Sequence, residues 1–307
     1  MNAIVIETGG LTKYYGTRCA VDHLDLKIPR GSICGFVGRN GAGKTTAIKM
    51  MLGLLTPTEG SSSLLGCDSQ ELTPQIRQRI GYVAEGHRLI GWMSIGRLEE
   101  FQKDFFPEQW DKNLFAEMME YFGLSKQQKI KHLSNGQRAQ VSLALTLAPN
   151  PELLIMDDPT LGLDAAIRRQ FLEGMVQLIM RQGRTILFSS HILGDIERVA
   201  DRIIVIDKGQ LRANCSLEEF RKAVKKVKFS FTGSIPENID IDGLLHCRKN
   251  AKELEVTVVG TSDDQIAQWT QAVGARMFHI VDMNLEDQFI EYTAPANRNK
   301  LFQWEEV

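Results

Sequence analysis

Short apolar runs alternate with glycine-containing loops and helical patterns from Leu11 to about Lys208. Apolar runs of this length, bounded by polar residues, are typical of buried strands in a parallel sheet. The clearest strand candidates are residues 32–37, 153–156 and 185–188, and residues 44–54 are predicted to be helical. The pattern predicts an α/β domain with a largely parallel sheet, whose ligands lie at the carboxyl ends of the strands.

The pattern changes between Gly86 and Lys131, where apolar residues recur at helical spacing. We predict a helical insert over about 86–150. Methionine and aromatic side chains in such a stripe could line a ligand site, but this spacing more often marks core positions. We therefore expect the following side chains to be buried: Leu98, Phe101, Phe105, Leu114, Met118 and Tyr121.

A second unit follows the charged stretch 221–228. It combines two strands of alternating apolar and polar residues with a helix, a further strand and a last helix that begins with a capping-box-like pair, Asn284 and Asp287. The elements are expected over 227–231, 254–258, 263–273, 276–281 and 289–292. The first domain would then cover 1–222 and a small α+β accessory domain 226–294, with a flexible polar tail over 295–307.

The composition narrows the range of partners. The chain has 307 residues, 43% of them hydrophobic, and a formal net charge of -2. Because this balance provides no overall basic field, we do not expect a nucleic acid partner. The five cysteines form no C-x-x-C pair, so we expect reduced thiols in the cytosol. No apolar run approaches the roughly 18 residues of a spanning helix, so work at a membrane would need another chain to cross it.

Residues 38–45 read G-R-N-G-A-G-K-T and match the phosphate-loop pattern between a predicted strand and a predicted helix. In such a loop backbone N–H groups face the phosphates, Lys44 reaches the β- and γ-phosphates, and Thr45 offers a hydroxyl to Mg²⁺. A glycine-rich turn without a ligand is the alternative, but the flanking elements favour ATP and Mg²⁺. The expected nucleotide ligands are Gly38, Arg39, Asn40, Gly41, Ala42, Gly43, Lys44, Thr45 and Thr46.

Asp157 and Asp158 directly follow the predicted strand 153–156. In a phosphate-loop ATPase the carboxylate at the end of this strand holds Mg²⁺, a role that suits Asp157. Asp158 would then face the attacking water as general base or orienter. Two acids after a strand are more often a loop start or a helix cap, but here they lie downstream of a phosphate loop.

Ser134 and Gly136 lie in L-S-N-G-Q, immediately before an apolar helical run. A hydroxyl and a glycine at a helix N-terminus can bind an anion. By itself this stretch would be read as an ordinary serine-capped helix start.

Together these stretches resemble the ATP-binding-cassette (ABC) family over roughly the first 220 residues. L-S-N-G-Q resembles the family's signature L-S-G-G-Q, and T-L-G-L-D at 160–164 resembles its D-loop. His191 resembles the switch histidine and Tyr15 the aromatic residue that stacks on adenine, although a lone histidine or tyrosine is usually structural. The S-S-H switch and the C-terminal N-L-E-D-Q-F-I-E-Y-T look like bacterial multidrug or antibiotic exporters.

The resemblance implies a P-loop NTPase fold and a head-to-tail homodimer or heterodimer, with each ATP between one subunit's phosphate loop and the other's signature helix. It also implies a separate transmembrane permease subunit, and a place in the cytoplasm at the inner face of the cell membrane. The resemblance implies that Ser134, Gly136 and Gln137 clamp the γ-phosphate in trans and that Asp164 links the two sites. It implies catalytic roles for Lys44, Asp158 and His191. It also implies that Thr45, Asp157 and Glu85 bind the metal.

Three residues depart from the family pattern. Asp158 replaces the usual glutamate, and because its side chain is one methylene shorter we expect slow but real hydrolysis. Asn135 replaces the first glycine of the signature, which adds a side chain near the nucleotide. Glu85 stands where the family has glutamine, and a carboxylate can approach Mg²⁺ but does not donate a hydrogen bond unless it is protonated.

Two other functions remain open. The first is a soluble ABC ATPase that acts on ribosomes or DNA, although the paired cassettes or long coiled coils of such proteins are absent here. The second is a slow or idle regulatory ATP binder, which the three departures would allow. We assign the accessory domain to dimer support or regulation.

Overall fold

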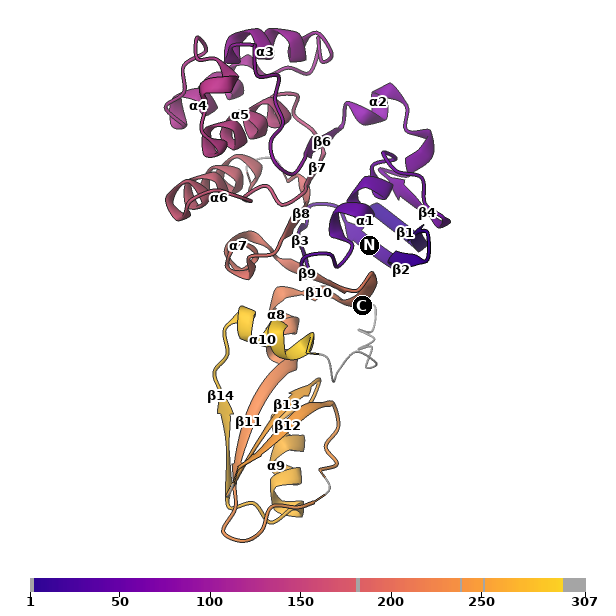
Figure 1. Ribbon diagram of the computed structural model, residues 1–307, viewed down its shortest axis with the longest axis vertical. Coiled ribbons are helices and arrows are strands. Elements are labelled where there is room, and N and C mark those ends of the chain that lie inside the picture. The colour runs from indigo at the N-terminus through magenta and orange to yellow at the C-terminus, as the bar shows by residue number, and fades with distance from the viewer. Residues whose placement is uncertain (1–2, 181–182, 238, 251, 295–307) are drawn as a thin grey trace. The chain divides into compact units, whose positions relative to one another are not determined.

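The computed structural model describes residues 3–180, 183–237, 239–250 and 252–294 (Figure 1). The chain divides into two compact units, Met1–Asn214 and Cys215–Val307. The division falls before the boundary expected near residue 222, because the helix that follows belongs with the second unit. The polar tail predicted over 295–307 lies outside the described residues. Among the described helices, none is both long enough and apolar enough to span a membrane.

A six-stranded sheet forms the centre of the N-terminal unit. Its order is β10-β9-β3-β8-β7-β6, and the pairs β3–β8, β3–β9, β7–β8 and β6–β7 are parallel. The central strands β7 and β8 are buried along their whole length, as apolar strands of parallel sheets usually are. The predicted α/β fold is therefore confirmed. The strands span Ile33–Val37 (β3), Ile80–Val83 (β6), Leu153–Met156 (β7), Thr185–Ser190 (β8), Arg202–Asp207 (β9) and Gln210–Ser216 (β10).

A second, antiparallel sheet accompanies it, which the sequence pattern did not predict. Its order is β2-β1-β4-β5, with strands at Ile4–Tyr15 (β1), Arg18–Pro29 (β2), Glu59–Leu64 (β4) and Cys67–Asp68 (β5). Leu24 and Ile28 of this sheet join Phe36 of β3 and Ile48 of α1 (Lys44–Met51) in one buried cluster. This shared core holds α1, and the loop before it, against both sheets.

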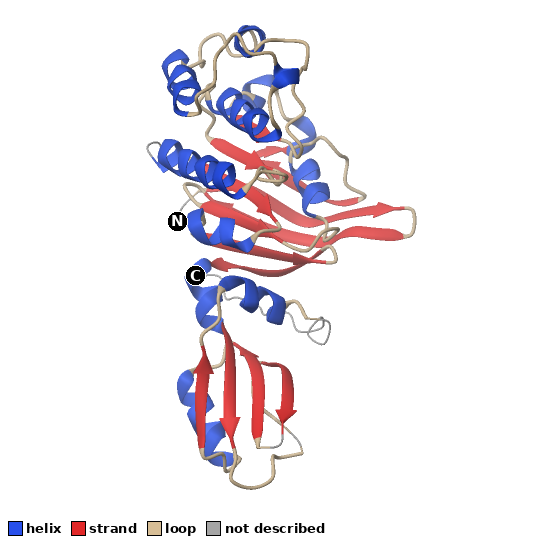
Figure 2. Ribbon diagram, turned by 60° about the vertical axis from the view of Figure 1, so that its left-hand side comes forward, coloured by secondary structure: helices blue, strands red, loops and turns tan. Residues whose placement is uncertain are grey.

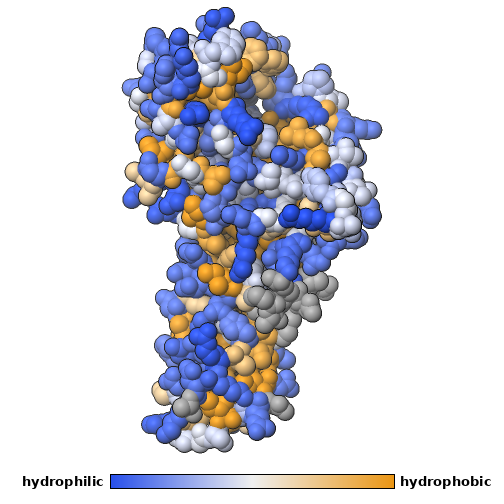
Figure 3. All heavy atoms as spheres, viewed as in Figure 1, coloured by the Kyte–Doolittle hydropathy of each residue, from blue (hydrophilic) through white to orange (hydrophobic). Residues whose placement is uncertain are grey.

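The predicted insert contains α3 (Ile95–Lys103), α4 (Lys112–Tyr121) and α5 (Asn135–Leu147), which lie together in Figure 1, and the short helix η2 (Ile130–His132). The expectation that its whole apolar stripe is buried is wrong. Leu98 and Met118 are buried, but Phe101, Phe105 and Tyr121 are 45%, 58% and 43% exposed. On the face drawn in Figure 3, apolar residues lie among polar ones.

The remaining helices of this unit connect the strands. They are η1 (Ser69–Glu71), α2 (Pro74–Arg77), α6 (Ala165–Met180) and α7 (Leu193–Val199).

The C-terminal unit is an antiparallel sheet of order β12-β13-β11-β14 (Figure 2). One face carries an apolar cluster with Val227, Phe229 and Val256, against which Trp269 of α9 packs. Phe220 of α8 packs edge to face on Tyr292 of α10, with ring centroids 5.4 Å apart, which explains why α8 belongs to this unit. The elements are α8 (Leu217–Ala223), β11 (Val224–Ser230), β12 (Leu244–Asn250), β13 (Glu253–Val259), α9 (Asp263–Ala272), β14 (Met277–Val281) and α10 (Leu285–Tyr292).

Candidate functional site

The loop 38–43 joins β3 to α1, and two of its glycines are required by their surroundings. A Cβ on Gly38 would lie 2.5 Å from the carbonyl oxygen of Ile206. Gly43 has φ of 108°, and a Cβ there would lie 2.4 Å from the carbonyl oxygen of Ala20. No other residue fits either position, so the loop runs close to β9 and β2 and turns its backbone toward the start of α1.

Lys44 is 8% exposed and its ammonium donates a hydrogen bond to the carbonyl oxygen of Gly38, over 2.7 Å. Burial lowers the pKa of Lys44, while the carboxylates of Asp158, Asp157 and Glu85 act in the opposite direction. The ammonium is therefore held at the mouth of the loop by a carbonyl and by the field of three acids. This is a position from which a cation can bind phosphate oxygens.

Asp157 lies at the end of β7, and one of its carboxylate oxygens is fixed by two hydroxyls. Thr45 donates to Oδ1 over 3.1 Å and Ser189 donates to the same oxygen over 2.9 Å. Burial raises the pKa of Asp157, and the two hydrogen bonds oppose that shift. The other oxygen, Oδ2, is buried and has no hydrogen-bond partner among the described residues. A buried unpaired carboxylate oxygen beside a threonine hydroxyl fits a hard divalent cation such as Mg²⁺.

Asp158 adopts a left-handed backbone conformation, with φ of 45°. Its N–H donates to the Ser189 hydroxyl over 2.8 Å, and its Oδ2 lies 2.7 Å from Nδ1 of His191. Its other oxygen, Oδ1, is buried and lacks a hydrogen-bond partner within the described parts of the chain. A carboxylate that is oriented by a histidine on one oxygen and unpaired on the other can accept a proton from a water molecule.

These groups meet in one cleft with a volume of about 440 Å³. The cleft lies where β3 and β7 end, at the carboxyl edge of the parallel sheet, which is the expected place for a ligand. Eleven of the predicted site residues line it: Tyr15, Asn40, Gly41, Ala42, Gly43, Lys44, Thr45, Thr46, Glu85, Asp157 and Asp158. Gly38 and Arg39 belong to the same loop, and His191 reaches the cleft through Asp158.

The signature residues do not line this cleft. Ser134 caps α5 in a capping box, in which its Oγ accepts from the N–H of Gln137 and the Gln137 side chain accepts from the N–H of Ser134. Gly136 packs closely on α6, since a Cβ there would lie 2.7 Å from Cγ2 of Ile167. Asp164 accepts hydrogen bonds from two backbone N–H groups at the start of α6. Within one chain these residues act as helix caps and packing positions.

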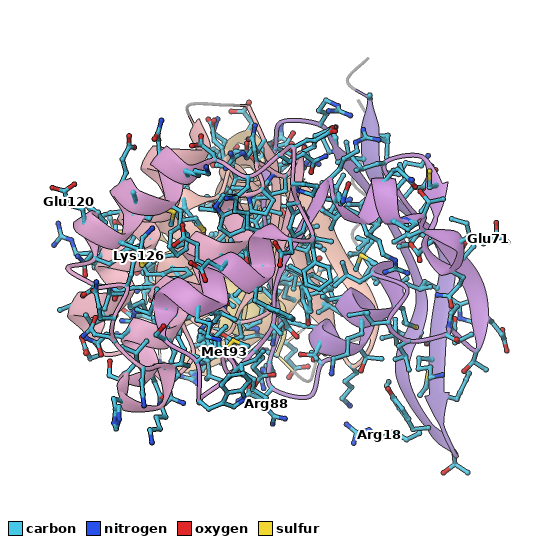
Figure 4. All side chains as sticks on the ribbon, turned by 90° about the horizontal axis from the view of Figure 1, so that it is seen from above. Arg18, Glu71, Arg88, Met93, Glu120 and Lys126 are labelled. Atoms are coloured by element: carbon cyan, nitrogen blue, oxygen red, sulfur yellow. The ribbon has the colours of Figure 1, made fainter. Side chains whose placement is uncertain are left out.

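Several residues near the cleft were not predicted from the sequence. Arg18 and Ala20 line the cleft from β2, and Arg18 lies at the end of the hairpin seen in Figure 4. Ser189 shares its hydroxyl between the two aspartates, and His87 contacts the loop after Asp158 over 2.9 Å. Ser189 could have been found from its place in S-S-H, whereas His87 stands in no motif.

Comparisons with known proteins agree with this geometry. A sequence profile described as ABC transporter matches residues 21–161. The chain is 34% identical over 224 residues to the bacitracin transport ATP-binding protein BcrA of Bacillus licheniformis, in an alignment that covers 72% of this chain and 73% of that protein. It is 36% identical over 210 residues to the Nod factor export ATP-binding protein I of Cupriavidus pinatubonensis, covering 67% of this chain and 64% of the relative.

A solved structure shares the fold. The dimeric structure of an ATP-binding cassette in a post-hydrolysis state, bound to ADP and Pi, superposes with a TM-score of 0.62 at 24% identity and covers 69% of this chain and 98% of that chain. The P-loop NTPase fold of the ABC type is thereby confirmed. With its phosphate loop, its paired aspartates and its extended similarity to BcrA, this chain belongs to the family of ABC transporter ATP-binding proteins.

Proposed function

We propose that this chain binds and hydrolyses ATP as the motor subunit of an ABC transporter. The observation that carries the proposal is the convergence of Lys44, Asp157 and the His191–Asp158 pair on one cleft at the carboxyl edge of the sheet. Phosphate-loop ATPases need these three functions at one place: a cation for the phosphates, a carboxylate for the metal and an acceptor beside the attacking water.

ATP and Mg²⁺ are the proposed ligands. The loop backbone and Lys44 would bind the phosphates, and the exposed ring of Tyr15 would stack on the base. Thr45 and Asp157 would hold Mg²⁺, which neutralises charge on the phosphates when it is bound. Glu85 lines the same cleft and offers a further carboxylate. Lys44 and both aspartates are buried, which restricts water around the phosphates.

Hydrolysis would depend on Asp158. Its unpaired oxygen Oδ1 would orient the water and accept its proton, while His191 fixes Oδ2. The side chain is one methylene shorter than glutamate, and a displacement of about 1 Å can cost on the order of 100-fold in rate. We propose slow but genuine turnover.

A second copy, or a related subunit, would complete the site. Ser134, Gly136, Gln137 and Asp164 do not line the cleft of their own chain, which is the arrangement required if they act on the nucleotide of a partner. The similar cassette bound to ADP and Pi is dimeric. Each ATP would then lie between two subunits, and its binding would drive their association.

The membrane partner would be a separate permease subunit, and this chain would work in the cytoplasm at the inner face of the membrane. Trp92 is 64% exposed, and Phe101 and Phe105 on and after α3 are also exposed. Exposed apolar side chains of this size favour a contact with another protein.

For the direction of transport, we propose export, because one similar protein is a Nod factor export ATP-binding protein.

The test is ATP hydrolysis and ATP-dependent dimerisation of the purified chain, with Lys44→Ala as the inactive control. Phosphate release that disappears in Lys44→Ala, together with co-purification of a multi-spanning membrane protein from the native host, supports the proposal. ATP-dependent dimers that release no phosphate would instead indicate a regulatory ATP binder. Salt-sensitive binding to RNA or DNA, without a membrane partner, would indicate a soluble ATPase of ribosomes or chromosomes.

A further inference from the structure

His87 lies in the turn that follows β6, two residues after Glu85 of the cleft. Gly86 and His87 both adopt left-handed backbone conformations, with φ of 80° and 45°. This turn directs the His87 side chain into the protein, where the residue is only 4% exposed. Arg88, the next residue, lies at the edge of the molecule and points outward (Figure 4). A histidine held in an unfavourable backbone conformation and buried beside a reaction site calls for a specific contact.

The contact is a hydrogen bond between Nε2 of His87 and the carbonyl oxygen of Pro159, over 2.9 Å. A carbonyl oxygen only accepts, so Nε2 carries the proton and donates it. Burial lowers the pKa of His87, which favours the neutral ring. Its other nitrogen, Nδ1, is buried without a hydrogen-bond partner in the described part of the chain. Among the described residues, the His87 ring therefore makes its hydrogen bond through Nε2, to the residue that follows Asp158.

Three side chains hold the strained loop at Asp158. Ser189 accepts from the N–H of Asp158, His87 donates to the next carbonyl, and the Thr160 hydroxyl donates to the buried Asp195 over 2.8 Å. Because the Asp158 φ of 45° is unfavourable for a residue with a side chain, the loop needs such contacts to keep it. Of the three, His87 comes from the turn that also presents Glu85 to the cleft.

We propose that His87 is a positioning residue for ATP hydrolysis: it fixes the Pro159 peptide and thereby ties the direction of the Asp158 carboxylate to the position of the Glu85 turn. This inference rests on the proposed function. A shift of the Glu85 turn would be transmitted to Asp158 through one hydrogen bond, without a contact between the two acids. Nucleotide binding through the phosphate loop does not involve His87.

The test compares His87→Phe, which keeps an aromatic ring but has no donor, with His87→Gln, whose Nε2 can reach the same carbonyl. Arg88→Ala, in the same turn but exposed, is the matched control. We expect His87→Phe to lower kcat roughly tenfold, with the KM for ATP changed by less than about twofold. His87→Gln should restore most of kcat. Arg88→Ala should match the wild type in basal turnover.

Hydrogen exchange gives a readout that does not depend on turnover. The backbone amides of Asp158 and of residues 160–163 should exchange faster in His87→Phe than in the wild type, and at wild-type rates in His87→Gln. Melting temperatures of all three variants identify any general loss of folding. The proposal is overturned if His87→Phe keeps wild-type kcat and exchange, or if His87→Gln is as slow as His87→Phe while both melt like the wild type. A wild-type chain that releases no phosphate would contradict the proposed function, and the exchange experiment would still decide the role of His87.

Discussion

Asp158 combines two properties that its chemistry alone does not explain, a short side chain and a left-handed backbone directly before a proline. Aspartate tolerates positive φ better than most residues with a side chain, because its short polar group can bond locally. Glutamate would reach farther toward a water molecule but would fit this backbone less well. At position 158 a longer side chain would therefore bring the carboxylate closer to the water but would increase the backbone strain.

Substitution of Asp158 should separate these two effects. We expect Asp158→Glu to hydrolyse ATP faster than the wild type, by up to about 100-fold, because the carboxylate moves closer to the water. The same variant should melt at a slightly lower temperature because of the backbone strain. Asp158→Asn, which cannot accept the proton, should nearly stop phosphate release. Equal steady-state rates in all three proteins would contradict the assignment of Asp158 as the base.

The elements around the site are tied together by ion pairs as well as by the core. Glu152 precedes β7 and accepts two hydrogen bonds from Arg79, which precedes β6, over 2.6 and 2.9 Å. Arg30, just after β2, donates to the same carboxylate over 3.2 Å. One side chain thus connects the ends of three strands, two of which lead to the cleft.

Glu152 gives a prediction about stability and pH. The Arg79 and Arg30 hydrogen bonds and charges lower the pKa of Glu152 below its ordinary value of 4.5. Its stabilisation is therefore fully present above that value and is lost as the pH falls through the lower folded-state pKa. Since the side chain is 37% exposed, we expect Glu152→Gln to cost only about 1 kcal/mol of unfolding free energy at about pH 7. Chemical denaturation at about pH 3 should find a smaller difference between the two proteins than at about pH 7.

The matched control for this prediction is the exposed pair Arg169–Glu173 on α6, with both side chains largely in water. Glu173→Gln should leave stability unchanged at both pH values, because exposed pairs one helical turn apart contribute little. A loss in Glu173→Gln as large as that in Glu152→Gln would mean that general charge, rather than the bridge between strands, is responsible.

The helices and strands also show which parts of the fold and of the site could be predicted from the sequence. Residues at the carboxyl ends of β3 and β7 were predicted to meet, because parallel strands bring these ends to one edge. The stripe from Leu98 to Tyr121 was recognised as helical, but Phe101, Phe105 and Tyr121 were wrongly assigned to the core. Helical spacing reports that apolar residues share a face, and it does not report whether this chain or another one covers that face. His87 was missed because a single histidine has no period and no fixed spacing to a partner.

At the scale of the whole molecule, the two units have separate apolar cores. The cluster around Phe36 lies within the N-terminal unit and the cluster around Phe229 within the C-terminal unit. Among the described residues, those that line the cleft all belong to the N-terminal unit. Nucleotide binding should therefore not require the C-terminal unit, for which we propose dimer support or regulation.

A chain that ends at Ser216, the last residue of β10, tests this division. We expect it to bind ATP like the full chain but to dimerise more weakly and to turn over ATP more slowly. Binding can be followed by calorimetry with a non-hydrolysable analogue, and association by sedimentation. Unchanged dimerisation and turnover would remove the proposed role of the C-terminal unit.

The hydroxyl of Ser189 leads to a last consequence. It has one proton, which it gives to Asp157, and it receives the N–H of Asp158. Loss of this hydroxyl removes both hydrogen bonds. Loss of the Asp157 carboxylate removes one of these two, the bond that it accepts from Ser189. In a double-mutant cycle of Ser189→Ala and Asp157→Ala, the unfolding free energies should therefore fall short of additivity by about 1 kcal/mol. The proposed metal ligand Asp157 and the proposed base Asp158 would then count as a single energetic unit, and single substitutions could not divide the stabilisation of the site between them.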